Sequence, residues 1–309
     1  MRISVDRVLP LRFRDGSPVR AASAVAPYGG GWLVAQDDAT HACWWRDGAG
    51  DPVRLLPAVA GHEVFDEAHG TKHLKPDLEA ACRVPGRDGA EDGVLLLGSG
   101  STPARMRSVL VPEPGGEPVV GDLAPLYARV AEVLGVPPDQ LNLEGAAVAG
   151  GTVRWFHRGR PAGGLPSASL ELPLDDLVAA TRGSLDPGRV RIARPREVHL
   201  GDGLAVTDAV AVDDRTTLVS AAAEDSPNAY DDGPVVASAL AVLVDGGVDG
   251  EVAARAMLPA LDGRVAKVEG LALRSNGSEP GRREVHLLAT VDADDPQVPS
   301  SALDLRVTW

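Results

Sequence analysis

Glu79-Ala80-Ala81-Cys82 and Glu144-Gly145-Ala146-Ala147 are two copies of a four-residue segment that occurs five times in the chain. A polar, usually acidic residue leads each copy, and small or aliphatic residues follow it. The other copies begin at Ser23, Asp208 and Glu269. Successive leaders are 56, 65, 64 and 61 positions apart, so five repeats of this length nearly fill the 309 residues. Such spacing is typical of a repeat architecture, although an alanine-rich chain can also repeat such segments by chance.

The repeat predicts an all-β fold, a single five-bladed β-propeller domain with four-stranded antiparallel blades. Small residues suit the innermost strand of a blade, because the backbones converge there on a narrow axis. The predicted blades cover approximately residues 18–60, 75–121, 141–194, 205–258 and 266–309, with a helical insertion at 122–135. The last repeat is one strand short, and a strand at 3–11 precedes the first repeat. Pairing these two segments closes the last blade without an exposed sheet edge.

Composition excludes several classes of protein. The formal net charge of −14 argues against a nucleic-acid partner, because binding to phosphates requires a basic surface. No segment approaches about 18 continuous apolar residues, and the first 15 residues contain no apolar run of signal-peptide length. We therefore expect a cytoplasmic protein without a membrane partner. The sequence does not indicate the oligomeric state.

The strand order of a propeller predicts where the polar residues gather. If the inner strand of a blade starts at one end of the axis, the second strand finishes at that same end. The residue leading each repeat and the residues after each second strand should therefore meet at one axial mouth. Those second-strand exits include Asp37, Ser99, His157-Arg158 and Glu224. We expect this mouth to be the functional site.

Four carboxylates from the repeat leaders repel one another at such a mouth unless something neutralises them. One solution is a bound cation, Ca²⁺ first and Mg²⁺ or Mn²⁺ next, held by Glu144, Asp208 and Glu269 with Asn228 as a neutral oxygen ligand. A second is ion pairing with Lys75 and Lys267, which leaves no place for a metal. A third is a wider, water-filled ring.

The long connection at 61–76 precedes the second repeat and has no regular periodicity. A loop of this length is often functional, and its histidines could act in acid–base chemistry or bind a metal. We predict His73, Lys75 and Glu79 as the catalytic residues. A zinc site is not favoured, because the segment lacks the glutamate of His-Glu-x-x-His. The alternative is a solvated loop whose histidines only form hydrogen bonds.

Basic and hydroxyl residues around the mouth predict an anion-binding site. Backbone donors of a Gly-Ser-Gly-Ser turn beside guanidinium groups suit a phosphate or a carboxylate. The alternative is a structural turn with surface arginines. The predicted substrate-binding residues are Lys72, Ser99, Arg105, Arg107, His157 and Arg158.

Glu144-Gly-Ala-Ala and Glu269-Gly-Leu-Ala resemble the Glu-Gly-Leu-Ala signature of esterase-like phytase propellers and, more loosely, the Glu-Gly of gluconolactonase-type calcium propellers. In the latter, a Glu, an Asn and an Asp hold an axial cation, which implies such roles for Glu144, Asn228 and Asp208. The segments 69–79 and 223–233 are similar to an uncharacterised propeller family of high-GC bacteria, a likeness that covers almost the whole chain and implies no activity.

We therefore expect a divalent-cation-dependent hydrolase that acts on a small anionic ester, phosphate or lactone at the axial mouth. One alternative is a non-catalytic propeller that binds a ligand or a protein, with a structural cation or lysine–carboxylate ion pairs. Another is a five-bladed glycosidase, which needs two carboxyl groups about 5–9.5 Å apart.

Overall fold

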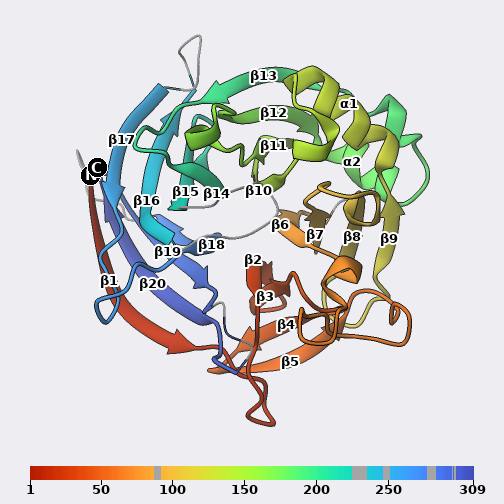
Figure 1. Cartoon of the computed structure of the whole chain (residues 1–309), viewed down its shortest axis with the longest axis horizontal. Helices are drawn as coiled ribbons and strands as arrows, with labels where there is room; N and C mark the ends of the chain where they lie inside the picture. Colours follow the sequence, from red (N-terminus) through yellow and green to blue (C-terminus); the bar gives the residue numbers. More distant parts are fainter. Residues whose placement is uncertain (87–91, 225–234, 246–250, 277–282, 294, 296) are drawn as a thin grey trace.

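Five antiparallel sheets of four strands each surround a central axis in the part of the chain that the structure describes (Figure 1). The structure is a computed structural model, and it describes all residues except 87–91, 225–234, 246–250, 277–282, 294 and 296. The predicted five-bladed β-propeller is confirmed. Within each blade, neighbouring strands are also neighbours in sequence, apart from the strand that closes the last blade.

Each blade begins with its inner strand at the axis and ends with its outer strand. The first blade contains β2 (Ala22–Tyr28), β3 (Gly31–Gln36), β4 (His41–Arg46) and β5 (Ala49–Arg54). The second contains β6 (Leu78–Val84), β7 (Gly93–Gly98), β8 (Arg107–Pro112) and β9 (Val119–Asp122). The third contains β10 (Leu143–Ala149), β11 (Thr152–His157), β12 (Ser167–Pro173) and β13 (Ala193–Val198). The fourth contains β14 (Ala205–Asp213), β15 (Thr216–Glu224), β16 (Val235–Val244) and β17 (Glu251–Met257). The fifth contains β18 (Val268–Asn276), β19 (Glu284–Val291), β20 (Ser301–Thr308) and β1 (Arg2–Pro10).

The N-terminal strand closes the last blade, as the leftover segments predicted. β1 pairs antiparallel with β20 from Arg2 opposite Thr308 to Pro10 opposite Ser301, with one register shift between Val5 and Arg7. The two strands therefore lie side by side although almost the whole chain separates them (Figure 1). This pairing satisfies the backbone groups that β20 would otherwise expose at a sheet edge.

Strands inside a blade are more buried than its outer strand, and the sequence character of the strands follows this difference. All six residues of β7 are buried, and that strand is a continuous apolar run. The outer strand β13 has exposed and half-buried residues except at its last position. A strand enclosed between neighbouring blades needs apolar side chains on both faces, whereas an outer strand needs them on one face at most.

Two helices cover the outer side of the second and third blades (Figure 1). They are α1 (Ala124–Leu134), within the predicted insertion, and α2 (Leu174–Thr181). Tyr127 of α1 packs edge-on against Trp155 of β11 with ring centroids 5.1 Å apart, and its hydroxyl donates to the Gly98 carbonyl at 2.7 Å. Neither of the helices in the described residues is long and apolar enough to cross a membrane.

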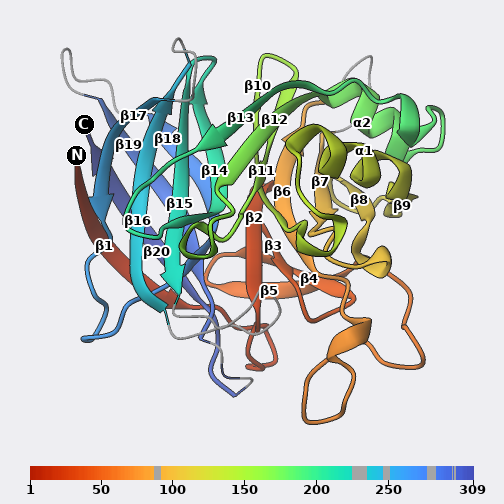
Figure 2. The ribbon, with the colours of Figure 1, turned by 45° about the horizontal axis from the view of Figure 1, so that its top comes forward.

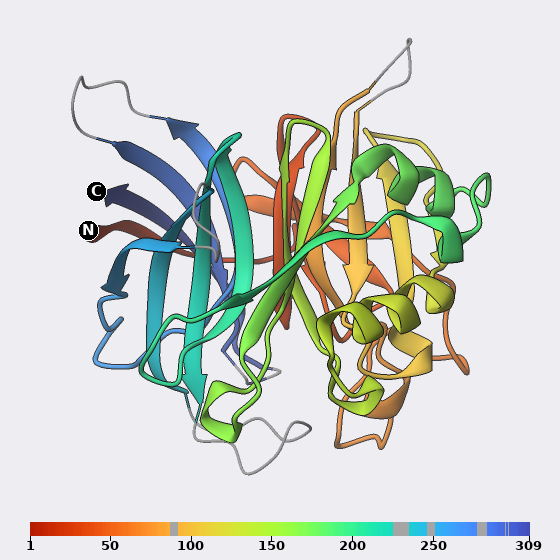
Figure 3. The same cartoon turned by 90° about the horizontal axis from the view of Figure 1, so that it is seen from above.

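The two ends of the ring differ in their connections. The β10–β11 hairpin turns at one end, seen at the top in Figure 3, and the inner strands begin at the opposite end. The β5–β6 connection, residues 55–77, extends away from the blades and returns to the axis just before β6 (Figure 2). Its only regular element among the described residues is a short 3₁₀ turn, η1 (Lys72–Leu74). The connection thus brings residues 75–77 to the axial mouth.

Candidate functional site

The repeat leaders start the five inner strands and lie around the axis, as the spacing predicted. Inner strands of neighbouring blades are in direct contact around the ring. The Ser23 hydroxyl of β2 donates to the Leu78 carbonyl of β6 at 2.6 Å, and Thr207 of β14 makes the equivalent bond to the Val268 carbonyl at 2.6 Å. These hydrogen bonds fix the inner strands of adjacent blades to one another at the mouth.

The glycine after the leader is required by the close approach of these strands. Gly145 has φ +71°, and a Cβ built on it would lie 2.7 Å from the Asp208 Cα of the next blade. A Cβ on Gly270 would lie 3.0 Å from the Ala24 Cα. Both distances are too short for a side chain, so the Glu-Gly pairs reflect backbone packing at the axis.

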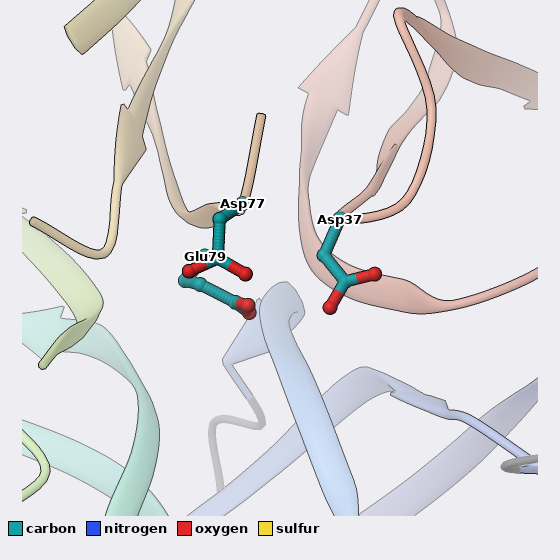
Figure 4. Close-up of side chains that lie close together, drawn as sticks. All are labelled: Asp37, Asp77 and Glu79. Atoms are coloured by element: carbon teal, nitrogen blue, oxygen red, sulfur yellow. The ribbon is translucent and has the colours of Figure 1, made fainter. Parts of the chain in front are cut away.

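Three carboxylates form what we call the first acidic cluster: Asp37 after β3, Asp77 just before β6, and Glu79 within β6 (Figure 4). One oxygen from each lies within 4.8 Å of the other two. Lys75 joins two of them, with its Nζ 2.6 Å from Asp37 Oδ2 and 2.7 Å from Asp77 Oδ1. Within the described residues, the carboxylate of Glu79 has no hydrogen-bond partner and no ion-pair partner.

Asp77 is the most firmly held member of the first acidic cluster. Arg105 Nη1 donates to its Oδ2 at 2.8 Å, and the Ser99 hydroxyl donates to the same oxygen. Although burial opposes the effect, Lys75 and Arg105 lower the pKa of Asp77. The Asp77 backbone is also in the left-handed region, with φ +56°, where a non-glycine residue is uncommon. This carboxylate is therefore ionised and fixed in place.

The pKa values of Glu79 and Asp37 are raised, in contrast to that of Asp77. Burial and the negative charge of Asp77 raise the pKa of Glu79 well above its usual value. Burial also raises the pKa of Asp37, although the ammonium group of Lys75 opposes this shift. The first acidic cluster therefore contains more negative charge than its one lysine neutralises.

Glu144, Glu224 and Glu269 form the second acidic cluster on the other side of the mouth, and two cations bridge it. Arg158 contacts Glu144 Oε1 at 3.1 Å and Glu224 Oε2 at 2.6 Å. Lys267 Nζ lies 2.8 Å from Glu224 Oε1 and 2.7 Å from Glu269 Oε1. Burial raises the pKa of Glu269 to about 7, although Lys267 opposes the shift.

The two clusters together are acidic overall. Glu79 and Glu144 lie close enough for the charge of one to raise the pKa of the other, so both clusters belong to one site. Among the described residues that take part in the clusters and their ion pairs, six are carboxylates and four are cations. Two negative charges are left over when all ten groups are ionised. Bound protons or a divalent cation would remove this excess.

Asp208 lies deeper than the other repeat leaders and binds backbone. It is 1% exposed, and its Oδ2 accepts the Leu271 N–H of the next inner strand at 2.5 Å. Backbone N–H groups of Ala209 and Ala146 also favour its charged form, but burial dominates and raises the pKa of Asp208 well above its usual value. Asp208 thus links the inner strands of the third, fourth and fifth blades.

The predicted metal ligands are only partly brought together. Glu144, Asp208 and Glu269 lie at the axis, but Glu144 binds Arg158 and Asn142, and Glu269 binds Lys267. Asn228 lies outside the described residues. In the part of the chain that is described, the group of carboxylates whose geometry could hold a metal ion is instead Asp37, Asp77 and Glu79.

Of the predicted catalytic residues, Lys75 and Glu79 lie together at the mouth. His73 is exposed on η1, two residues before Lys75. Lys72, predicted to bind substrate, contacts Glu67 Oε1 at 2.7 Å on the same connection. The roles of His73 and Lys72 remain predictions.

The predicted anion-binding residues are largely engaged with protein groups. Arg105 and Arg158 are each bonded to carboxylates, and Ser99 donates to Asp77. Arg107 Nε donates to the Ala104 carbonyl at 2.6 Å. His157 is fully buried, and its Nδ1 lies 3.0 Å from the Asn142 carbonyl oxygen. An anion at this mouth would have to share these cations with the carboxylates.

The sequence contains an alternation of charges at the start of two inner strands, in which the prediction of the site included every residue except Asp77. Lys75, Asp77 and Glu79 alternate, and so do Lys267 and Glu269. Alternate residues of an extended chain point to the same side, which agrees with the contact of Lys267 with Glu269, but Asp77 is in the left-handed region and is not placed by this rule. From the sequence, Asp37 was identified only as a polar residue that follows the second strand of the first blade.

Comparisons with solved structures give weak likenesses over most of the chain. They include a glucose dehydrogenase (13% identity, 99% of each chain covered, TM-score 0.39). They also include the GH43 endo-arabinanase from Bacillus licheniformis (9% identity, 97% of this chain and 96% of that chain, TM-score 0.41) and the N-terminal domain of Nup159 (8%, 91% and 74%, TM-score 0.35). At these scores the likenesses do not bear on the chemistry of this chain.

No curated protein matches the chain significantly. A family model does match it, over residues 71–296, a range that includes the mouth residues from Lys75 to Glu269 and four of the five inner strands. The protein therefore belongs to DUF6910, a family of unknown function.

Proposed function

We propose that the axial mouth binds one divalent cation, Ca²⁺ or else Mg²⁺ or Mn²⁺, on Asp37, Asp77 and Glu79, and that the protein is a cation-dependent hydrolase of a small anionic ester, phosphate or lactone. The observation that carries this proposal is the convergence of three carboxylate oxygens within 4.8 Å of one another. Hard cations of this kind prefer carboxylate oxygens.

The charge of the mouth supports the same proposal. When all their groups are ionised, the two acidic clusters exceed their cations by two negative charges among the described residues, which equals the charge of one divalent ion. Asp77 is ionised and held by Arg105, so it offers a fixed ligand. Glu79 has no ion-pair partner among the described residues and can turn toward a cation without breaking a contact.

In this proposal Lys75 changes partner when the cation binds. Its ammonium group lies between Asp37 and Asp77, where it compensates their charge. A cation on the same carboxylates would repel it and leave it free to hold the anionic group of a substrate. A bound cation would polarise the substrate oxygen or activate water.

Glu269 is suited to move a proton in this site. Burial raises its pKa to about 7, so near neutral pH both its acid and its base forms are populated. Lys267 holds one of its oxygens at 2.7 Å and fixes the orientation of the carboxyl group. His73 would join the reaction only if the connection before β6 folded toward the mouth.

The proposal is tested by cation removal and return. After treatment with EDTA, adding about 1 mM Ca²⁺ is expected to raise the melting temperature, because an ion that binds only the folded state stabilises it. Asp37→Asn and Glu79→Gln should abolish this shift and the heat of Ca²⁺ binding in calorimetry. Glu224→Gln, which alters the second acidic cluster, is the matched control and should keep the shift. If none of Ca²⁺, Mg²⁺ and Mn²⁺ binds the EDTA-treated protein, the proposed cation site is contradicted.

Turnover is tested on aryl phosphates, lactones, aryl esters and aryl glycosides with each cation. We expect hydrolysis of one of the first three classes that disappears with EDTA and in Glu79→Gln. Cation binding without any turnover would reduce the proposal to a binding propeller.

A non-catalytic propeller stabilised by lysine–carboxylate ion pairs is the second candidate, and one observation favours it. Lys75 and Lys267 each already bridge two carboxylates. Lys75→Gln separates the candidates. It should tighten Ca²⁺ binding if Lys75 competes with a cation, whereas it should only lower the melting temperature if Lys75 is the permanent counter-ion.

A further inference from the structure

A polar cavity lies at the end of the ring opposite the axial mouth, between the third and fourth blades. Its volume is about 200 Å³. We call it the interblade cavity and define it by Thr152, Arg154, Glu171, Asp214, Thr217 and Asp245. Alanine residues of the two inner strands, Ala147 of β10 and Ala211 of β14 among them, leave the space that larger side chains would fill. The size suits a small metabolite, since pockets for larger ligands measure about 300–1,000 Å³.

Arg154 of β11 lines this cavity and has unused hydrogen-bonding capacity. Its side chain is 8% exposed. A guanidinium group has five N–H donors. Nε donates to the Ser169 hydroxyl at 3.1 Å, and Nη1 reaches Asp245 Oδ1 only at 3.4 Å. Nη2 is buried and has no hydrogen-bond partner among the residues that the structure describes.

The carboxylate nearest to Arg154 is shared with a second arginine. Asp245 Oδ1 accepts from Arg196 Nη1 at 3.0 Å, which is the shorter of its two contacts with arginines. Burial lowers the pKa of Arg154, and Asp245 only partly opposes that shift. A buried guanidinium nitrogen without a hydrogen-bond partner is costly, and a ligand carboxylate would accept a charge-assisted hydrogen bond from it.

The rim of the cavity is negatively charged, opposite in sign to Arg154. Asp214 is exposed and has no ion pair among the residues that are described, in contrast to its neighbour Asp213, which contacts Arg283 at 2.9 Å. Asp214 belongs to the fourth blade, yet its Oδ1 lies 3.7 Å from the position that a Cβ on Gly150 of the third blade would take. The carboxylate thus reaches across the cavity entrance.

The lining as a whole excludes a simple anion. Its charged side chains comprise two arginines and four acidic residues: Arg154, Arg194, Glu171, Asp213, Asp214 and Asp245. An anion would gain from Arg154 but be repelled by the rim, whereas a simple cation would leave the Arg154 donors unpaired. A ligand that carries both charges matches the two ends of the cavity.

We propose that the interblade cavity binds a small zwitterion, an α-amino acid or a similar amino carboxylate, with its carboxylate on Nη2 of Arg154 and its ammonium group against Asp214. The cavity is separate from the axial mouth, so this site does not depend on the cation or on hydrolysis there.

Calorimetry on the whole chain with glycine, L-alanine, L-serine and L-glutamate as probes tests the site. At least one amino acid should bind, while acetate and methylammonium, which each present one of the two charges, should bind at least about tenfold more weakly. Inorganic phosphate is the third comparison. Binding of acetate or phosphate as tight as that of every amino acid, or no binding of any amino acid up to about 20 mM, would overturn the proposal.

Substitutions distinguish binding in the interblade cavity from binding elsewhere and from an effect on folding. Arg154→Gln should weaken amino-acid binding at least about tenfold. Because a buried arginine can also matter for folding, Asp214→Asn provides an exposed substitution that should weaken amino-acid binding and, by removing a repelling charge, strengthen acetate binding. Asp139→Asn, an exposed aspartate on the helical side, is the matched control and should change neither. Unchanged amino-acid binding in Asp214→Asn would overturn the assignment of the ammonium group.

Discussion

At the scale of single residues, this propeller places ionisable groups where water cannot reach them. His157 is the simplest case, because burial dominates its ionisation. It is fully buried, and its Nδ1 faces the Asn142 carbonyl, while its Nε2 has no hydrogen-bond partner within the described part of the chain. Burial lowers the pKa of His157 to about 4.

This shift predicts a loss of stability in mild acid. Above about pH 6.5 His157 is neutral in both the folded and unfolded chains, so its contribution to stability is complete. Between about pH 6.5 and 4 only the unfolded chain takes up the proton, and the free energy of unfolding falls by up to about 3 kcal/mol.

The measurement is the melting temperature between pH 4 and 8. His157→Gln, which cannot be protonated, should have a shallower decline than the unmodified protein over that range. His73→Gln, which removes an exposed imidazole, is the matched control. Identical slopes for His157→Gln and the unmodified protein would contradict the assignment.

At the scale of strands and helices, the decisive contacts join the inner strands of adjacent blades. β10 approaches β14 so closely that Gly145 touches the Asp208 backbone, and Ser23 and Thr207 bond the neighbouring inner strands. The mouth residues are attached to these strands. Their relative positions therefore depend on backbone packing at the axis.

Gly145→Ala tests this packing. The new methyl group would lie 2.7 Å from the Asp208 Cα, and φ +71° is unfavourable for alanine, so we expect a loss of about 3 kcal/mol in the free energy of unfolding. Gly30→Ala is the matched control, because Gly30 has φ +73° but no described atom within 4 Å of its built Cβ. It should show only the conformational cost, about 1 kcal/mol. Equal effects of the two substitutions in urea unfolding would show that the close approach is unimportant.

The positions of the inner strands could be predicted from the sequence, whereas the side-chain contacts between blades could not. The four-residue segments that begin with Ser23, Glu79 and Glu269 lie within inner strands, because the narrow space at the axis admits only small residues. The ion pair of Lys75 with Asp37 was not predictable, since it joins two blades across 38 positions of sequence and depends on the path of the connection. Asp77 was missed for a local reason: its left-handed backbone directs it toward the mouth, and no sequence pattern reports that conformation.

At the scale of the whole molecule, one strand decides whether the ring is closed. β1 pairs with β20 along its length, and the contact of Arg7 with Asp304 at 2.6 Å adds an ion pair across that seam. Ile3 is 9% exposed and belongs to the hydrophobic core that the fourth and fifth blades share. Without β1, the apolar side of β20 and its backbone groups would face water.

Deletion of residues 1–10 is therefore expected to lower the melting temperature by several degrees and to cause association through β20. Light scattering and thermal unfolding measure both effects. A synthetic peptide of residues 1–10 should restore the monomer signal and part of the stability, whereas a peptide of the same composition in scrambled order should not. A deletion variant that melts like the full chain and does not associate would contradict this role of β1.

The pairing of β1 with β20 also has a consequence for biosynthesis. Residues 2–10 leave the ribosome before the five inner strands, whereas their partner, residues 301–308, emerges after all five. While residues 11–300 are being synthesised β1 has no partner, and the fifth sheet cannot be completed until residues 301–308 have been made. Long-range pairing of this kind slows folding. The strand β1 carries Arg2, Asp6 and Arg7, and charges of this kind disfavour association of an unpaired strand with other chains.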